Sequence, residues 1–419
     1  ATPEPSASPT PSPTPSPTPE ESAADRIKAA LEARKAAVAA AGADAFGTDN
    51  RSQTEITPFK GTATQLYAPN GSSYISTQTS LVNIVVFMRF ADQNEYLNTD
   101  SVTAFNKVYN SNDGSYYSLK HYLETMSYGT VSATGAAFPR SVDGQTFVSV
   151  QLSHPENYYK PYSSTNTIGY TTDAEARSRE GAMLTEAVNG AKAQISAVYT
   201  DAQLDVHGAA GGGADGRLDA ITFAYLPENT SVPINYADLL WPHKSSIISG
   251  APTVGSKAVG NYSMVDASEI LDPTDTYSST VIHEFLHILG MPDLYRYTTT
   301  GYPLYNYDVM AYTASDSLGE PQSLLQYNIR NMLGFAPDLS EITATTSNIT
   351  LKTAQYATNN EQSAVIIKSP YSSTEYFVVE MKQSTGVDDA VPNYGTDGGL
   401  LVYRVNTNVF GNASGPPDQ

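Results

Sequence analysis

One short stretch of the chain places histidines and acidic residues at the spacing of a metal-binding site. It begins at His283 and reads HEFLHILGMPD, so His283 and His287 lie four positions apart. Residues at this spacing project from one face of an α-helix, and both imidazoles can therefore reach one ion. Glu284 lies beside them, where its carboxylate can accept a proton from an attacking water molecule. We therefore expect a zinc-dependent hydrolytic site.

The residues that follow this helix bring a third ligand within reach. Gly290 can end the helix with a positive φ, and Pro292 prevents the helix from resuming. The chain then turns back, so that Asp293 can supply an oxygen ligand to the same ion. Structural zinc sites favour cysteine-rich shells, and the chain has no cysteine. A catalytic zinc site held by His283, His287 and Asp293 is therefore the expectation.

A second motif, YDVMAY, spans residues 307–312. A methionine in a tight turn downstream of the zinc helix is the second mark of the metzincin pattern, and its sulfur forms an apolar floor beneath the ligands. Met310 is the candidate for this turn. Tyr312 is a candidate catalytic residue whose phenol would hydrogen-bond the developing oxyanion. The alternative is that Tyr312 is a packing residue in a chain with 29 tyrosines.

These motifs resemble the M6 family of secreted metallopeptidases, the immune inhibitor A-like group. Further blocks carry the resemblance: an apolar strand at 82–87, a tyrosine-rich run at 121–129, DGRLD at 215–219, WPH at 241–243 and EYFVVE at 375–380. The resemblance implies a zinc endopeptidase with His283, His287 and Asp293 as ligands and Glu284 as the general base. The chain departs from the family at Met310–Tyr312, which is more similar to the turn of astacins and serralysins.

The N-terminal part divides into two segments. Residues 1–20 form a Pro/Ser/Thr repeat that cannot bury a core, and we expect a disordered spacer. Residues 21–75 begin with an alanine-rich stretch of high helix propensity that ends at Gly42. This helical arm has two interpretations, a plain N-terminal arm or a pro-segment that blocks the cleft. In the second interpretation Asp49 is the candidate latency ligand for the zinc.

Residues 76–336 mix strand and helix patterns, which indicates an α+β catalytic domain of the zincin type with a twisted mixed sheet and an active-site helix. Expected strands cover Leu81–Phe90, parts of 130–152 and Asp219–Leu226, and expected helices cover 100–110, 115–127, 173–198, 279–289 and 317–334. Residues 337–419 predict a β-rich C-terminal module with strands at 348–352, 363–368, 376–382 and 400–406. We expect the native protein to continue beyond Gln419.

Three aspartates flank a glycine-rich loop at 208–216. Asp205, Asp215 and Asp219 offer several carboxylate oxygens beside flexible backbone, a combination that can surround a hard cation such as Ca²⁺. The spacing does not match an EF-hand. A calcium site and a solvated acidic loop are both compatible with this sequence.

Composition narrows the class of protein. The net charge is −20 and the sequence pI is near 4.6, which argues against nucleic acid and anionic membranes as partners. No apolar run is long enough to span a bilayer. We expect a secreted monomer, with its signal peptide already removed, that acts on a protein or glycoprotein substrate. The alternative is a catalytically silent or latent module that binds surfaces or glycoproteins, although the intact Glu284 argues against it.

Overall fold

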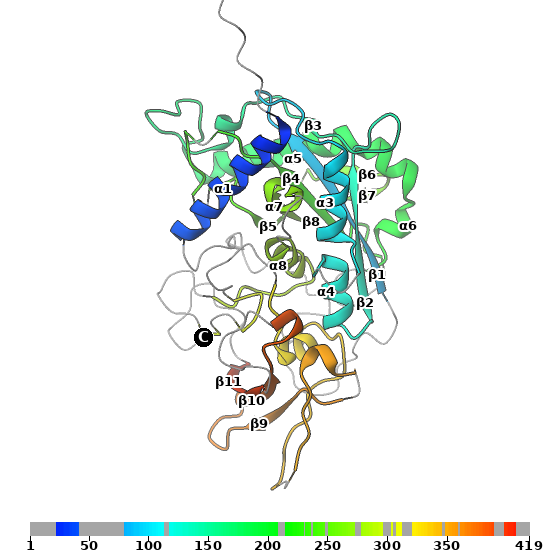
Figure 1. Ribbon diagram of the computed structural model, residues 1–419, viewed down its shortest axis with the longest axis vertical. Helices are drawn as coiled ribbons and strands as arrows, with labels where there is room; N and C mark the ends of the chain where they lie inside the picture. Colours follow the sequence, from blue (N-terminus) through cyan, green and yellow to red (C-terminus); the bar gives the residue numbers. More distant parts are fainter. Residues whose placement is uncertain are drawn as a thin grey trace, which may run out of the picture.

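A six-stranded mixed sheet forms the centre of the fold (Figure 1). The strand order is β2-β1-β4-β8-β5, with β3 paired to the end of β1. All neighbours are parallel except the edge strand β5, which is antiparallel to β8. The strands are β1 (Thr79–Arg89), β2 (Val131–Phe138), β3 (Val150–Gln151), β4 (Ala220–Tyr225), β5 (His243–Ser246) and β8 (Asn261–Asp266).

The computed structural model describes only part of the chain, and all structural statements concern that part. The described ranges are 22–41, 79–112, 117–207, 214–229, 231–235, 238–247, 250–272, 278–295, 303–304, 307–311, 321–345, 348–358, 361–388 and 398–407. The short elements within them are η3 (Glu156–Tyr159), α6 (Asp201–Leu204), β6 (Thr253–Val254), β7 (Lys257–Ala258), η5 (Asn328–Met332), η6 (Ala354–Tyr356) and η7 (Gly386–Asp388).

The central strand β1 is buried on both faces, as its nearly continuous apolar sequence predicts. Successive side chains of a strand point to opposite faces, and this alternation assigns them to two separate cores. One core receives Ile84, Val86 and Met88, and the other receives Leu81, Val85 and Phe87.

Helices cover both faces of this sheet. The long helix α5 (Asp173–Val198), with the boundaries expected from its sequence, packs its apolar side on one face. The Thr172 side chain accepts the Glu175 N–H and so caps its first turn. The opposite face is covered by α3 (Thr99–Tyr109), α4 (Leu119–Met126), α7 (Ala267–Leu271) and α8 (Ser279–Ile288).

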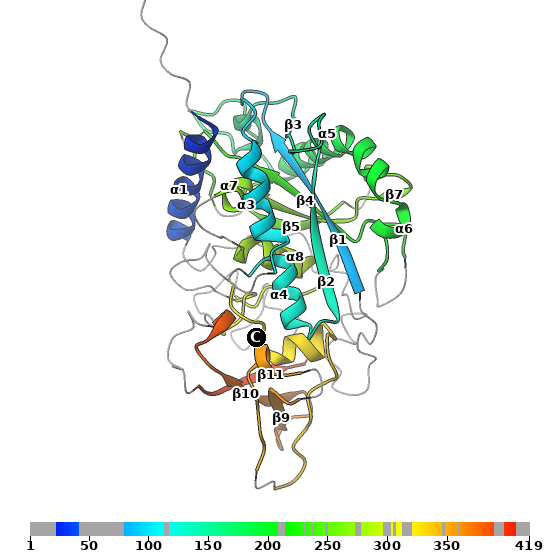
Figure 2. The same ribbon diagram turned by 45° about the vertical axis from the view of Figure 1, so that its right-hand side comes forward.

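A second sheet of three antiparallel strands forms the β-rich C-terminal part, in the order β11-β10-β9. Its strands are β9 (Ala364–Lys368), β10 (Glu375–Lys382) and β11 (Gly399–Asn406), which confirms three of the four strands expected there. In both views α8 lies between the large sheet and these strands (Figures 1 and 2). Apolar side chains of β9, β10 and β11 belong to the same core as Phe285 of α8.

One expectation was wrong, and another is confirmed only in part. No strand forms at 348–352, where the side chains of Asn348 and Ile349 are exposed and have no sheet face to cover. The helix expected at 317–334 is helical, among its described residues, only from Gln326 to Met332, with η5 as its π-helical part. The backbone N–H groups of Ser323 and Leu325 are bound by the carboxylates of residues far away in the sequence, so they do not form helical bonds.

The N-terminal helix α1 (Ala23–Ala41) is docked on the body of the protein. Ile27, Ala30 and Leu31 are buried, and the helix packs against α7. Arg34 Nε lies 2.6 Å from Glu269 Oε1, and both side chains are buried. The Arg34 guanidinium also lies 4.4 Å above the ring of Trp241. The expected helix is therefore present and is anchored by a buried charge pair.

No described helix is long and apolar enough to cross a membrane.

Arg34→Ala tests this anchor. The substitution leaves Glu269 buried without its guanidinium partner, and loss of one member of a buried pair costs about 3–5 kcal/mol of unfolding free energy. Urea denaturation measures the change. The control is Lys35→Ala on the same helix. Its pair with Glu32 is largely exposed, so solvent screening limits the loss to about 1 kcal/mol or less. Equal effects of the two substitutions would contradict the anchoring role of Arg34.

Candidate metal centre

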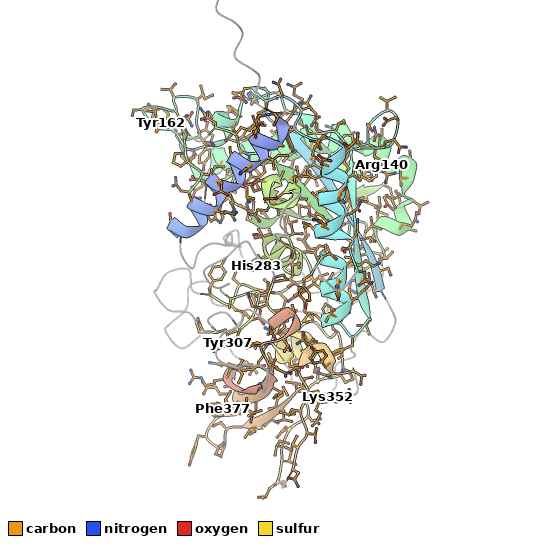
Figure 3. The ribbon with its side chains drawn as sticks, in the orientation of Figure 1. Arg140, Tyr162, His283, Tyr307, Lys352 and Phe377 are labelled. Carbon is orange, nitrogen blue, oxygen red and sulfur yellow. The ribbon has the colours of Figure 1, made fainter. Side chains whose placement is uncertain are left out.

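The helix α8 is buried along its whole length in the core between the two sheets. His283, Glu284 and His287 are each at most 1% exposed. Its sequence is apolar apart from these three residues and the serine and threonine at its start. Figure 3 labels His283 between the large sheet and the C-terminal strands. Polar groups held so deeply require specific partners, because water does not solvate them there.

Three ligand atoms converge at this helix. His283 Nε2 lies 3.0 Å from Asp293 Oδ1, and His287 Nε2 lies 3.2 Å from the same oxygen. The two Nε2 atoms are 3.1 Å apart. The two imidazole planes are perpendicular. The structure therefore brings together His283, His287 and Asp293, as the spacing of the motif predicts.

Backbone carbonyls fix the tautomer of both rings. His283 Nδ1 lies 2.9 Å from Val309 O, and His287 Nδ1 lies 2.7 Å from Met291 O. A carbonyl oxygen can only accept, so each Nδ1 carries the proton and donates it. Each Nε2 then presents a lone pair toward Asp293. This arrangement of ring N–H groups on carbonyls is the usual second layer of histidine metal sites.

The end of α8 supplies one of these carbonyls. Gly290 has φ +96, a left-handed conformation that glycine adopts without steric cost. The N–H of Gly290 donates to His287 O and that of Met291 donates to Leu286 O, which together form a Schellman motif. The same turn leaves Met291 O against the His287 ring. The expected role of Gly290 is confirmed, and the turn also orients a ligand.

Electrostatics within the group favour an anionic Asp293 beside a neutral histidine. Burial lowers the pKa of the His283 imidazole. Burial alone raises the pKa of the Asp293 carboxyl, yet the attraction of the His287 and His283 rings in their protonated form holds it well below its usual range. The ionised carboxylate thus lies beside two Nε2 atoms that present lone pairs to a cation once both rings are neutral.

These three residues fit a zinc ion. Zinc takes imidazole nitrogen and carboxylate oxygen at about 2.0–2.2 Å in a tetrahedral shell, which places neighbouring ligand atoms about 3.3 Å apart. The observed separations of 3.0, 3.1 and 3.2 Å are close to that value. Three electron-pair donors at such distances repel one another unless a cation lies among them. Among the described residues, this is the group of His and acidic side chains that can hold a metal.

The turn around Met310 lies beside the centre. Met310 is fully buried, and its carbonyl accepts the Leu294 N–H at 2.7 Å. The preceding residue, Val309, provides the carbonyl that holds His283. Figure 3 labels Tyr307, at the start of this turn, between His283 and Phe377. Tyr312 and Asp49 lie outside the described residues, so their roles as catalytic residue and latency ligand stay predictions.

The three aspartates considered for calcium have other partners. Asp205 accepts the backbone N–H groups of Asp215 and Gly216 and pairs with Lys257 at 2.6 Å. Asp219 accepts the N–H groups of residues 206 and 207, and Asp215 accepts that of residue 217. Within the described part of the chain they do not form a metal-ligand group. The loop at 208–213 lies outside that part, so calcium binding stays a prediction.

One further histidine has a structural environment. His243 is buried on β5, where its ring contacts Glu180 Oε1 at 2.8 Å and Trp241 O at 2.6 Å. The Tyr262 hydroxyl donates to the same glutamate oxygen. These buried contacts indicate a structural role for His243. The sequence does not predict the carbonyls of Val309 and Met291 as partners of the two histidine rings, because any residue type can supply a backbone acceptor.

The chain was compared with protein families, curated proteins and solved structures. No protein family matches the chain, and no curated protein matches it. Among solved structures, wild-type OgpA from Akkermansia muciniphila matches in two crystal forms. The first has 9% sequence identity and a TM-score of 0.30, covering 79% of this chain and 85% of that chain. The second has 10% identity and a TM-score of 0.28, covering 80% and 85%.

Zinc binding to the folded chain tests the centre. We expect zinc at 100 times its dissociation constant to raise the unfolding free energy by about 2.7 kcal/mol, and a chelator to reverse the effect. His287→Gln removes a ligand and should abolish the response. The control is His154→Gln, which changes an exposed histidine and should leave the response intact. A zinc-dependent rise that persists in His287→Gln would place the ion elsewhere.

Proposed function

We propose that the chain is a zinc-dependent endopeptidase that hydrolyses peptide bonds with Glu284 as general base. The observation that supports it best is the convergence of His283 Nε2, His287 Nε2 and Asp293 Oδ1 within 3.2 Å of one another. Glu284 follows the first ligand on the same buried helix. A purely structural zinc site has no use for a carboxylate at that position.

The chain's own residues have distinct tasks in this mechanism. His283, His287 and Asp293 would hold the zinc, which when bound acidifies water and polarises the scissile carbonyl. Glu284 accepts the proton of the attacking water and later donates it to the leaving amine nitrogen. Val309 O and Met291 O keep the two rings in the tautomer that binds metal. The core around α8 restricts the access of bulk water to the ligands, which strengthens their electrostatic interactions.

The wider assignment is also a proposal. The motif from His283 to Asp293, followed by Met310 in a buried turn, supports a zincin-type enzyme of the M6 group. The mixed sheet with one antiparallel edge strand and the helix α8 beneath it is compatible with that fold. We propose a secreted enzyme whose substrate is a protein or glycoprotein.

Glu284→Gln tests the general base. The substitution keeps the size of the side chain but removes the proton acceptor, so hydrolysis of casein or a fluorogenic peptide should fall by about 10²–10⁴-fold. Zinc content by elemental analysis should stay at the wild-type value, because Glu284 is not a ligand. Glu32→Gln, an exposed change on α1, serves as the control and should retain activity.

Two results would redirect the assignment. Wild-type turnover in Glu284→Gln would remove Glu284 from the mechanism. A wild-type chain that binds zinc but cleaves neither substrate would favour the alternative of a silent or latent binding module. Inhibition of the wild type by 1,10-phenanthroline distinguishes a metal-dependent peptidase from a contaminating peptidase that needs no metal.

A further inference from the structure

We infer that Asp308 is a positioning residue for the metal centre, and that through it the C-terminal sheet sets the orientation of the His283 ring. The inference rests on the proposed zinc site. It concerns a path of buried hydrogen bonds from β10 through residues 323–328 to the turn at 308–311. We refer to this path as the relay.

The relay begins at the turn beside the metal ligands. Val309 O accepts the ring N–H of His283 at 2.9 Å. Met310 O accepts the backbone N–H of Leu294 at 2.7 Å, directly after the ligand Asp293. Two successive carbonyls of one turn therefore hold the His283 ring and the backbone that directly follows Asp293. A rotation of this turn would displace both ligands together.

Asp308 fixes the conformation of that turn. Its Oδ1 accepts the Met310 N–H at 2.8 Å, and its backbone O accepts the Ala311 N–H at 2.9 Å. Its Oδ2 accepts the Leu325 N–H and the Asn328 Nδ2–H, both at 2.7 Å. The carboxyl is fully buried, so no water can replace a lost donor. Asp308 thus joins the turn to the segment 325–328.

The C-terminal part holds this segment from the other side. Asp388 accepts the Ser323 N–H at 3.0 Å and the Ser323 hydroxyl at 2.8 Å. Glu380 Oε2 accepts the Gln326 N–H at 2.9 Å and the Tyr403 hydroxyl at 3.0 Å. Three carboxylates therefore bind the backbone of one short segment, and two of the three come from the C-terminal part. Each of the three accepts a main-chain N–H of this segment, so the backbone itself is positioned.

A buried lysine pairs with two of these three carboxylates. Lys382 Nζ lies 2.6 Å from Ser323 Oγ and within 3.5 Å of Glu380 and Asp388. Burial by itself lowers the pKa of this lysine, but Asp388 and Glu380 hold it above its ordinary value. Lys382 therefore stays protonated and cannot act as a base toward the Ser323 hydroxyl. The cluster serves the relay and is not a second active site.

The test compares Asp308→Asn with the wild-type chain in two measurements. Zinc affinity is measured by competition with a chromophoric chelator, and ligand geometry by the visible absorption spectrum of the Co²⁺-loaded protein. Asparagine keeps the size of the side chain but places an NH₂ group opposite a backbone N–H. We expect zinc affinity to fall by about 10–100-fold, with an altered Co²⁺ spectrum in a folded protein. Circular dichroism reports the folding.

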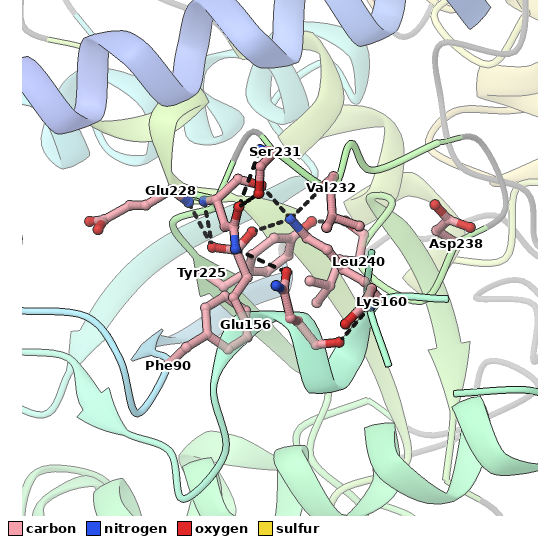
Figure 4. A network of polar contacts seen from close by, with 12 residues as sticks. Phe90, Glu156, Lys160, Tyr225, Glu228, Ser231, Val232, Asp238 and Leu240 are labelled. Atoms are coloured by element: carbon pink, nitrogen blue, oxygen red, sulfur yellow. Dashed lines mark hydrogen bonds and ion pairs between the residues drawn. The ribbon is translucent and has the colours of Figure 1, made fainter. Parts of the chain in front are cut away.

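Glu156→Gln is the matched control (Figure 4). Glu156 is also a buried carboxylate that pairs with a lysine, Lys160, at 2.5 Å. It also accepts two backbone N–H groups, those of Glu228 and Asn229, at 2.9 Å each. These contacts do not involve the turn at 308–311. We therefore expect Glu156→Gln to reduce stability while zinc affinity and the Co²⁺ spectrum stay at wild-type values.

Each outcome decides the inference. A folded Asp308→Asn protein with wild-type zinc affinity and Co²⁺ spectrum overturns the inference. A Glu156→Gln protein whose Co²⁺ spectrum changes in the same way as that of Asp308→Asn also overturns it. If Asp308→Asn does not fold, Asn328→Leu removes one donor to Asp308 while it keeps the branching and the number of heavy atoms of the side chain, and wild-type readings in that variant also overturn it. Glu380→Gln, on β10, tests the far end of the relay, where a smaller change in the same direction is expected. An unchanged spectrum there overturns the role of the C-terminal sheet.

Failure of the zinc site itself would look different. A wild-type chain that binds neither Zn²⁺ nor Co²⁺ overturns the proposed function, and with it the inference, before any substitution is made. A wild-type chain that binds both ions, with unaltered variants, overturns the relay alone.

Discussion

The metal centre depends on a mutual constraint among three electron-pair donors. His283 Nε2, His287 Nε2 and Asp293 Oδ1 lie 3.0–3.2 Å apart in a buried environment, where their repulsion is poorly screened. Such a group is stable under either of two conditions. The first is that the surrounding structure holds the donors in place in the absence of a metal ion, and the second is that a cation binds among them. The protein provides the first condition through two carbonyls, and zinc would satisfy the second.

The architecture explains how the carbonyls reach their positions. Helix α8 lies against one face of the large sheet, so its two histidines, four positions apart, are held on one side of a rigid element. The Schellman turn at Gly290 reverses the chain within three residues of the helix end and brings Met291 O and Asp293 back to it. The remaining carbonyl comes from the Met310 turn, which the core shared with the C-terminal sheet supports. Both parts of the fold therefore contribute to one site.

Local sequence predicted those features whose causes are local. The apolar run of β1, the boundaries of α5, the helix α8 and the positive φ of Gly290 each follow from propensity, periodicity or a terminating residue. The ligand set follows from spacing on that helix. Residues 317–334 could not be predicted in the same way, because carboxylates from residues such as Asp388, 65 positions away, bind N–H groups that a helix would otherwise use. The same limit applies to the contact of Val309 O with His283 and to the N–H groups that donate to Asp308.

The docking of α1 has a spectroscopic consequence. The chain contains a single tryptophan, Trp241, which lies 1% exposed beneath the Arg34 guanidinium. Its emission therefore originates from one place in the molecule, the contact of α1 with the segment that precedes β5. Release of α1 would expose the indole to water and shift its emission to longer wavelength, whereas the 29 tyrosines report on the fold as a whole. Tryptophan fluorescence is thus a built-in reporter that separates undocking of the N-terminal helix from unfolding of the body.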